Sequence, residues 1–471
     1  MEKMKVIVIG TGASGWITVS SLLKLDFVES VKIIGSSTIP SIGVGESTTL
    51  SFFENFLSDN PELIKRFVQQ SDAAVKYGVY YKGWSNKDFL HHFKPSCLFQ
   101  RNGMGGEETW GQLLSRKRKD DHIHDLIGSQ LIEFSNRNEV SLNTQEYPHS
   151  WHFDAGKFIA FMQNEFENDP RVELVEDSIK GCDYSGNRIN AAFGEKKTYI
   201  ADYFVNCTGS HNVFHCSYKD YSQYLLTNKA MVFPLEYTNK EEQFHPFTVA
   251  KTMKYGWRWI TPTQSRIGTG YVFSTDHISV DEAVDEFTSD IGDKSIQPKI
   301  VDFTPKVAID PFKLNYCSIG MAQGFLEPLD APGIAITLSS LNSLSEILSH
   351  IHSGYDELSL KQGVANINWE IQREYEFWCS FILHQYKTCT RDDTQFWIDQ
   401  KNVNCNFYDQ FIDWMIEVPP SLKSRYEFMM FWYTTAARDI VWESGFPPPK
   451  LKEIPVETIT HLDYINQFSS K

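Results

Sequence analysis

The sequence is poor in positive charge. Its 471 residues carry 44 Lys and Arg against 60 Asp and Glu, which gives a formal net charge of -16. Nucleic-acid binding requires clustered Lys and Arg to contact phosphates. The basic run at residues 116–119 is followed at once by Asp120 and Asp121, so we interpret it as a solvated helix end and expect no nucleic-acid partner.

Long apolar runs and paired cysteines are also missing. No run approaches the roughly 18 apolar residues of a membrane-spanning helix, and MEKMKVIVIG leads directly into a strand rather than a signal peptide. The 8 cysteines show no CxxC spacing, and His91 and His92 have no partner at a metal-ligand spacing. We therefore expect a cytoplasmic protein without a membrane span, a disulfide framework or a metal site.

A dinucleotide-binding motif lies near the start of the chain. The apolar strand VIVI runs into Gly10, Gly12 and Gly15, a helix-like stretch follows, and a second strand ends at Ile34. In such a βαβ unit the glycines let the backbone approach a pyrophosphate, which rests on the helix N-terminus. This context favours nucleotide binding over a purely structural turn.

Two later segments are predicted to return to the same sheet. Residues 199–210 form an apolar strand that ends at Thr208 and Gly209, and residues 314–334 combine a strand, a Gly-rich loop and a helix beginning near Gly333. A nucleotide site built from three distant segments is typical of FAD enzymes. We therefore predict an α/β fold with a Rossmann-type FAD module.

The predicted organisation has two parts. The FAD module occupies residues 1–345 and is discontinuous, with segments near 1–50, 150–215 and 310–345 and an antiparallel, strand-rich insertion near 218–310. Residues 346–471 show apolar residues at helical spacing and are predicted to form a mainly helical substrate-binding module.

Short segments along almost the whole chain match the motifs of one family, in order. They are GTGASGW (10–16), IPSIGVGEST (39–48), VKYGVYYKGW (75–84), WHFDA (151–155), DYFVNCTGS (202–210), GWRWITP (256–262), GYVFS (270–274), GFLEPLDAPGI (324–334) and TRDDTQFW (390–397). On these segments the chain resembles the flavin-dependent halogenases of the tryptophan halogenase family. The pairing of GxGxxG with a WxWxIP-like motif separates that family from the related aromatic hydroxylases.

The resemblance implies a two-component enzyme with the fold of FAD-dependent monooxygenases. In that family FADH2, O2 and a halide ion give hypohalous acid, which halogenates an electron-rich aromatic or heteroaromatic substrate. A separate NAD(P)H-dependent flavin reductase is the implied partner, and the sequence leaves a homo-oligomer open. The residues expected at FAD are Gly10, Gly12, Ala13, Ser14, Gly15, Ser36, Ile42, Gly43, Val44, Gly45, Glu46, Thr208, Gly209, Gly320 and Leu326.

Two side chains match the family's catalytic positions. Lys76 lies eight residues before Trp84, which is the family's spacing between its active-site lysine and a tryptophan. The amine would hydrogen-bond hypohalous acid or become a haloamine, and either route delivers an electrophilic halogen at a fixed point. Asp330 replaces the family's glutamate and would take the ring proton or orient the oxidant. Glu327 also matches and is interpreted as structural, whereas Lys82, on the same predicted strand as Lys76, is interpreted as structural or solvated.

The halide-binding positions depart from the family pattern. The family binds halide through adjacent backbone N–H groups at positions 332 and 333, but Pro332 has no N–H and leaves only the donor of Gly333. Chloride holds its water more firmly than bromide or iodide do. We therefore expect bromide or iodide to be used better than chloride.

The barrier motif and the ribose-binding position depart as well, the former because Thr261 stands where the family has Ile before the proline. Trp257 and Trp259 share one face of a strand ended by Pro262, and the family uses this pair to keep substrate away from flavin. At the end of the second strand Gly35 replaces the acid that binds adenosine ribose. Ser36 or Ser37 would substitute only weakly, so FAD is expected to exchange as free reduced flavin.

The substrate site matches the family least. His91 and Phe93 occupy positions that sandwich indole in tryptophan-specific members, although a packed aromatic strand explains them equally well. Thr435 and Ala436 lie where those members use paired tyrosines to hold the amino-acid part of tryptophan. We expect a phenol, an indole or another electron-rich heteroarene instead. The alternatives are a flavin-dependent hydroxylase and a non-catalytic flavin-binding protein.

Overall fold

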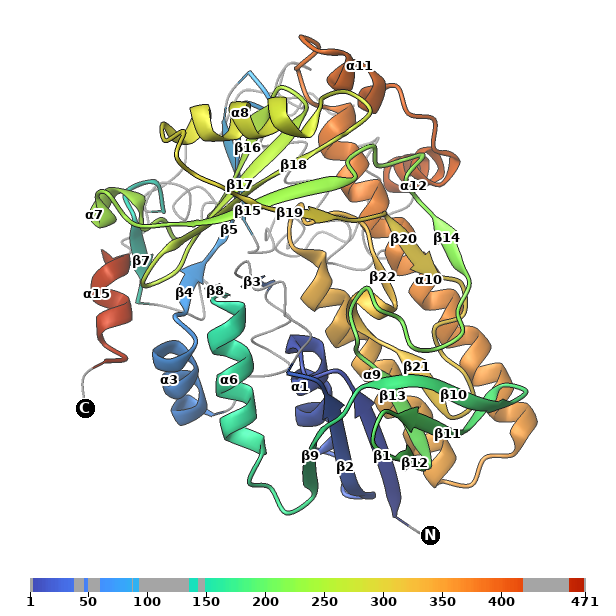
Figure 1. The fold of residues 1–471 in the computed structure, drawn as a ribbon. Helices are drawn as coiled ribbons and strands as arrows, with labels where there is room; N and C mark the ends of the chain where they lie inside the picture. Colours follow the sequence, from blue (N-terminus) through green and yellow to red (C-terminus); the bar gives the residue numbers. More distant parts are fainter. Residues whose placement is uncertain are drawn as a thin grey trace, which may run out of the picture.

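A computed structural model describes residues 3–37, 46–49, 60–86, 88–92, 135–142, 149–417 and 457–469. Its nucleotide-binding part is a five-stranded parallel sheet in the order β21-β13-β1-β2-β9 (Figure 1). The strands are β1 (Met4–Ile9), β2 (Val28–Gly35), β9 (Val172–Glu176), β13 (Tyr203–Asn206) and β21 (Tyr316–Ser318). The sheet therefore joins three distant segments of the sequence, as predicted.

The apolar run of β1 is buried on both faces of this sheet. Val6 and Val8 enter the main core with helices α1 (Ala13–Leu22), α6 (Ala155–Phe166) and α9 (Pro332–His352). Ile7 and Ile9 face a second core under the small sheet of β10 (Ile179–Ser185), β11 (Arg188–Gly194) and β12 (Thr198–Tyr199). Two covered faces explain why the strand shows no polar alternation.

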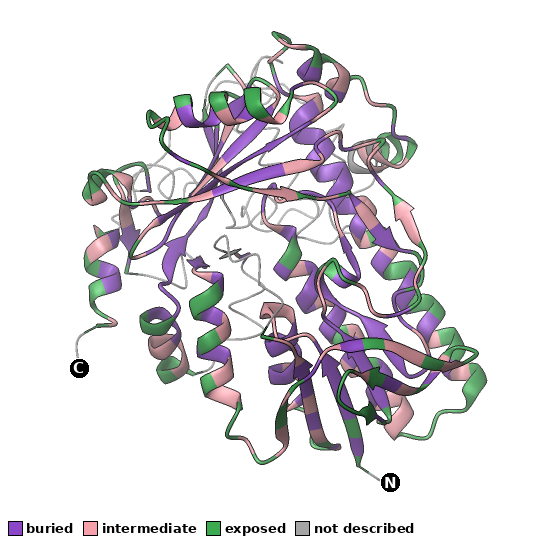
Figure 2. Cartoon of the chain, viewed as in Figure 1, coloured by how far each residue is buried: buried purple, intermediate pink, exposed green. Residues whose placement is uncertain are grey.

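A seven-stranded sheet in the order β19-β15-β18-β17-β16-β5-β6 forms the second layer. Its strands are β5 (Gly78–Lys82), β6 (Phe89–His92), β15 (Lys229–Leu235), β16 (Thr248–Met253), β17 (Gly256–Pro262), β18 (Ile267–Phe273) and β19 (Lys299–Asp302). Helix α8 (Val280–Ile291) covers one face, and Figure 2 shows the central strands buried. The sheet is wider than the predicted insertion and is mixed, since β16 pairs with β5 in parallel.

A short sheet carries Lys76. Strand β4 (Ala74–Lys76) pairs with β8 (Ser150–Phe153), which also pairs with β3 (Glu46–Ser47). The prediction that Lys76 and Lys82 share one strand was wrong, because the chain leaves β4 at Lys76 and enters the large sheet at Gly78. Lys76 is buried, whereas Lys82 is exposed.

Among the described residues after 331 helices dominate, although one short strand is also present. The helices are α9, α10 (Glu357–Lys387), α11 (Gln395–Lys401), α12 (Asn406–Glu417) and α15 (His461–Asn466). Strand β23 (Thr458–Thr460) pairs with β7 (Glu139–Ser141). The other elements are α3 (Pro61–Gln70), α7 (Lys240–Gln243), η2 (Gly320–Ala322), β14 (Tyr218–Asp220), β20 (Lys306–Ala308) and β22 (Gly324–Phe325). Among the described residues, no helix combines the length and apolar character needed to cross a membrane.

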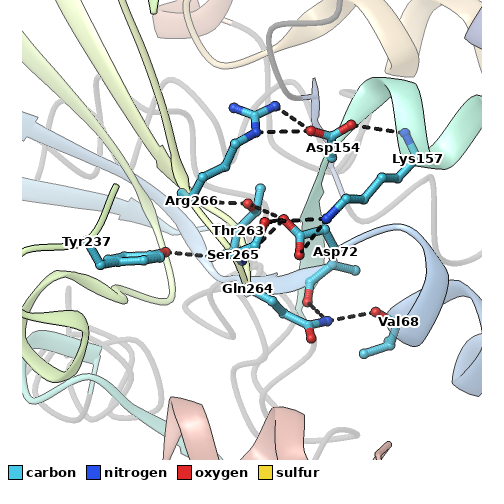
Figure 3. Close-up of polar contacts among 10 residues, drawn as sticks. Val68, Asp72, Asp154, Lys157, Tyr237, Thr263, Gln264, Ser265 and Arg266 are labelled. Carbon is cyan, nitrogen blue, oxygen red and sulfur yellow. Dashed lines mark hydrogen bonds and ion pairs between the residues drawn. The ribbon is translucent and has the colours of Figure 1, made fainter. Parts of the chain in front are cut away.

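A buried aspartate connects the large sheet to the helices beneath it (Figure 3). Asp72, just after α3, adopts a φ of 60° and accepts hydrogen bonds from Thr263 Oγ1 at 2.6 Å and Ser265 Oγ at 2.7 Å. In the same turn between β17 and β18, Arg266 donates through Nε to Asp154, the N-cap residue of α6, at 3.0 Å. These bonds fix the end of β17, the strand that carries Trp257, relative to the nucleotide-binding part.

Candidate functional site

The GxGxxG turn has the geometry that makes glycine necessary. Gly10 has a φ of 114°, and a Cβ added there would lie 2.3 Å from the carbonyl oxygen of Cys207. A Cβ on Gly15 would lie 1.9 Å from the oxygen of Gly10. The turn therefore packs directly on the end of β13, where Thr208 donates to Asn206 Oδ1 at 2.7 Å.

Open space lies where a dinucleotide would run. A Cβ added to Gly12, Gly209 or Gly333 would meet no atom of the described residues within 4 Å. Gly12 is the N-cap of α1 and has no side-chain cap, so the first N–H groups of that helix are available to an anion. A Cβ on Gly320 would lie 2.4 Å from Ser14 Oγ, which brings the third segment against the motif. This cradle fits a pyrophosphate.

Several expected cofactor and substrate residues cannot be placed. Ile42, Gly43, Val44, Gly45, Phe93, Thr435 and Ala436 lie outside the described residues, as does the side chain of Glu46. The remaining positions are placed as follows. Ala13 begins α1, Ser36 directly follows β2, and Leu326 is buried in the main core.

Lys76 is fully buried at the end of β4. Its Nζ donates to the carbonyl oxygen of Thr48 at 3.0 Å. Burial lowers the pKa of the ammonium group to about 7, and the negative charge of Asp330 acts in the opposite direction. A lysine whose pKa lies near neutrality and whose strongest charged neighbour is a carboxylate has the properties of a catalytic amine.

Asp330 lies in a strained loop and contacts two residues of the large sheet. Asp330 and Ala331 have φ values of 61° and 57°, a left-handed conformation that is costly for residues other than glycine. The carboxylate accepts a hydrogen bond from the hydroxyl of Tyr81, and His91 Nδ1 lies 3.2 Å from its other oxygen. Two residues expected in different roles, Asp330 and His91, are thus brought together. The ring of Phe381 lies 5.4 Å from that of His91.

Glu327, interpreted as structural from the sequence, connects three distant elements. Its buried carboxylate accepts from Thr227 Oγ1 at 2.7 Å, from Trp257 Nε1 at 3.0 Å and from the Tyr386 hydroxyl at 3.0 Å. Burial raises the pKa of this carboxyl to about 7, and the three donors oppose that rise. No local sequence pattern could have identified these partners, because they come from β17, α10 and the segment before β15.

The two indoles lie on one face of β17, as their spacing predicts. The ring centroids of Trp257 and Trp259 are 6.2 Å apart, and Trp257 is almost fully buried. Gly270 makes room for the outer indole, since a Cβ there would lie 2.2 Å from the Trp259 ring. Pro262 is the last residue of the strand. Glu327 therefore holds the inner indole by its N–H, and the adjacent strand accommodates the outer one.

The predicted halide position is the start of a long helix. Pro332 is the first residue of α9 and Gly333 the second, and the helix runs for 21 residues. Proline is well tolerated at this position because the first N–H groups of a helix have no partner within it. Gly333 therefore offers a backbone N–H at the positive end of the helix dipole.

Comparisons with known proteins agree on one family. The family model for tryptophan halogenases matches residues 5–437. The chain is 26% identical to tryptophan 7-halogenase RebH of Lentzea aerocolonigenes, covering 85% of this chain and 79% of the relative. It is 24% identical to tryptophan 6-halogenase SttH of Streptomyces toxytricini, covering 88% and 85%. The solved structure of BrvH, a flavin-dependent halogenase from Brevundimonas sp. BAL3, shares the fold with a TM-score of 0.75 at 20% identity, over 99% of both chains.

Proposed function

We propose that this chain, which belongs to the tryptophan halogenase family, is a two-component halogenase acting on an electron-rich aromatic substrate. The observation that carries the proposal is the fully buried Lys76 amine with Asp330 as its charged neighbour. A binding protein would gain nothing from such an amine, because burying it lowers stability. A separate NAD(P)H-dependent flavin reductase supplies the reduced cofactor.

The open cradle at Gly12 and Gly209 would hold FAD. In its reduced form the bound cofactor would supply the two electrons with which O2, one halide ion and one proton give hypohalous acid and water. Lys76 captures the hypohalous acid and presents the halogen to the substrate ring. The ring gains a carbon–halogen bond and loses a proton to Asp330, which passes that proton to the hydroxide leaving hypohalous acid, so that one water is released. Trp257 and Trp259 keep the substrate away from the cofactor.

The halide is bromide or iodide in preference to chloride. Of the two positions whose backbone N–H groups bind halide in the family, only Gly333 has an N–H, because Pro332 has none. A site with fewer donors compensates less for lost hydration, and this favours the less firmly hydrated ions. The substrate is a phenol, an indole or another heteroarene, with His91 at the edge of its site.

One incubation tests the function. The protein is supplied with a flavin reductase, NADH, FAD, O2, equal chloride, bromide and iodide, and a panel of indoles and phenols, and products are identified by mass. We expect brominated or iodinated products from the parent and no such products from Lys76→Ala. Lys82→Ala is the control and should retain them, because Lys82 is an exposed lysine on β5, the next strand along the chain. A scavenger of free hypohalous acid excludes halogenation in solution.

Other product masses would contradict the proposal. Oxygenated products that form with or without bromide would identify a hydroxylase. NADH consumption without any product across the panel would favour a flavin-binding protein without turnover. Halogenation by Lys76→Ala at the parent rate would overturn the assignment of the lysine.

A further inference from the structure

The end of β2 has no room for an acidic side chain. A Cβ added to Gly35 would lie 2.4 Å from both Oγ1 and Cγ2 of Thr11, within the nucleotide-binding turn. Such an approach is far inside van der Waals contact, so Thr11 and a side chain at position 35 exclude each other. Thr11 thus occupies the place from which a ribose-binding acid would extend in a Rossmann fold.

A carboxylate lies at the same edge on the neighbouring strand. Glu176 ends β9 and is in register with Gly35, and Asp177 N donates to the Gly35 carbonyl oxygen at 2.9 Å. The backbone N–H and the hydroxyl of Ser37 both donate to Glu176 Oε1, at 2.9 and 3.1 Å. Figure 1 shows β9 beside β2 at the edge of the sheet.

These contacts keep Glu176 ionised and oriented. The hydrogen bonds from Ser37, with a smaller contribution from Lys196, lower the pKa of its carboxyl. Lys196 Nζ also donates to the Glu176 carbonyl oxygen at 2.5 Å, which places a positive charge beside the strand end. An ionised carboxylate offers about four acceptor positions, and Ser37 uses two of them on one oxygen.

We propose that Glu176 accepts hydrogen bonds from the ribose hydroxyls of the adenosine half of FAD, in place of an acid at the end of β2. This inference rests on the proposed function, since it assumes that FAD occupies the cradle at Gly12. The serines expected to substitute weakly for the missing acid have a different role here. Ser37 orients the carboxylate that does the binding.

Binding measurements test this without turnover. FAD, FMN, ADP and 2′,3′-dideoxy-ADP are titrated calorimetrically into the parent, Glu176→Gln and Glu173→Gln. Glu173 is a matched control, since it lies on the same strand and pairs with Lys32. We expect Glu176→Gln to weaken FAD and ADP about tenfold, as loss of a charge-assisted hydrogen bond does. FMN and dideoxy-ADP, which lack the adenosine hydroxyls, are expected to bind both proteins alike.

Three outcomes would overturn the inference, and they are distinguishable. If the parent binds FAD and Glu176→Gln binds it equally well, the assignment of Glu176 is wrong and the proposed function stands. If the parent does not bind FAD at all, the proposed function fails and the inference falls with it. Equal loss of FAD affinity in Glu173→Gln would show a general effect of strand charge rather than ribose binding.

Discussion

Lys76 combines full burial with a titratable amine, and this combination lowers stability. Its pKa is about 7 in the folded protein and about 10.4 in an unfolded chain. Between these two pH values the unfolded state binds more protons, so stability rises as pH rises. The destabilisation is fully present below pH 7 and absent above the unfolded pKa. Natural chains retain such a residue where function requires it.

Replacing Lys76 by methionine should therefore stabilise the protein while abolishing halogenation. The gain in Tm should be a few degrees at pH 6 and should be much smaller near pH 10, because the unfolded parent then begins to lose the proton that the folded parent has already lost. Asp330 keeps its contacts with Tyr81 and His91 in the variant. Thermal unfolding of parent and variant from pH 6 to 10 checks this, and a gain independent of pH would contradict it.

Pro332 offers a test of halide choice at the same scale. Pro332→Ser restores a backbone N–H at the start of α9 and should raise the ratio of chloride to bromide product about fivefold, the value of one modest hydrogen bond. Ala331→Ser is the control, since it changes the neighbouring side chain without adding an N–H. Mass spectrometry of products made at equal halide concentrations gives the ratio. If the ratio of chloride to bromide product is unchanged in Pro332→Ser, the missing N–H is not the cause of the halide preference.

At the scale of elements, Glu327 joins the loop before α9 to β17 and α10. Glu327→Ala should destabilise the protein by about 3 kcal/mol, because three buried donors lose their acceptor. Glu327→Gln keeps one oxygen and should cost less. Urea unfolding measures both against Glu236→Ala, an exposed glutamate beside β15. Equal stability of Glu327→Ala and the control would mean that the carboxylate does not hold these elements together.

Local patterns predicted some elements from the sequence and missed others. The βαβ unit was predictable because its glycines and its doubly buried strand lie within 35 residues of the start of the chain. The pairing of β16 with β5 was not, since it joins Thr248 to Val79 across the chain and no short-range signal encodes it. The division between β4 and β5 was missed because it also depends on tertiary pairing: Lys76 pairs with Ser150 of β8, whereas Gly78 pairs with His92 of β6 in another sheet.

The residues of the candidate site likewise divide into those that the sequence predicted and those that it missed. The lysine, the indole pair and the glycine turn were predictable, because each is a residue type at a fixed local spacing. The partners of Glu327, the contact of Asp330 with His91 and the place of Glu176 beside Ser37 depend on distant segments meeting. Sequence spacing could therefore name candidate groups, and the tertiary fold determines which of them touch.

At the scale of the whole molecule, the far end of the described chain closes the outer edge of the Lys76 strand. His461 Nε2 accepts from the Val75 N–H at 2.9 Å, and its Nδ1 lies 2.9 Å from the carbonyl oxygen of Phe244, to which it donates. The ring also stacks on Phe244 with centroids 4.0 Å apart. Burial lowers the pKa of His461 to about 3, so the ring is neutral in the folded protein.

Replacing His461 by alanine should therefore lower kcat for halogenation about tenfold, because Val75 adjoins Lys76. The Kd for FAD should be unchanged, because the glycine cradle lies elsewhere.

The same histidine makes stability depend on pH. The parent should lose stability as pH falls below about 6.5, because the ring becomes protonated in the unfolded state while it stays neutral in the folded state. The variant should lose less stability over the same pH range. Asp463→Asn, two residues further along α15, is the control for helix stability. Steady-state kinetics, FAD titration and unfolding at pH 5 and 7 separate these effects. A variant that loses FAD affinity as much as kcat would indicate general unfolding, and one with unchanged kcat would show that Lys76 is positioned without this segment.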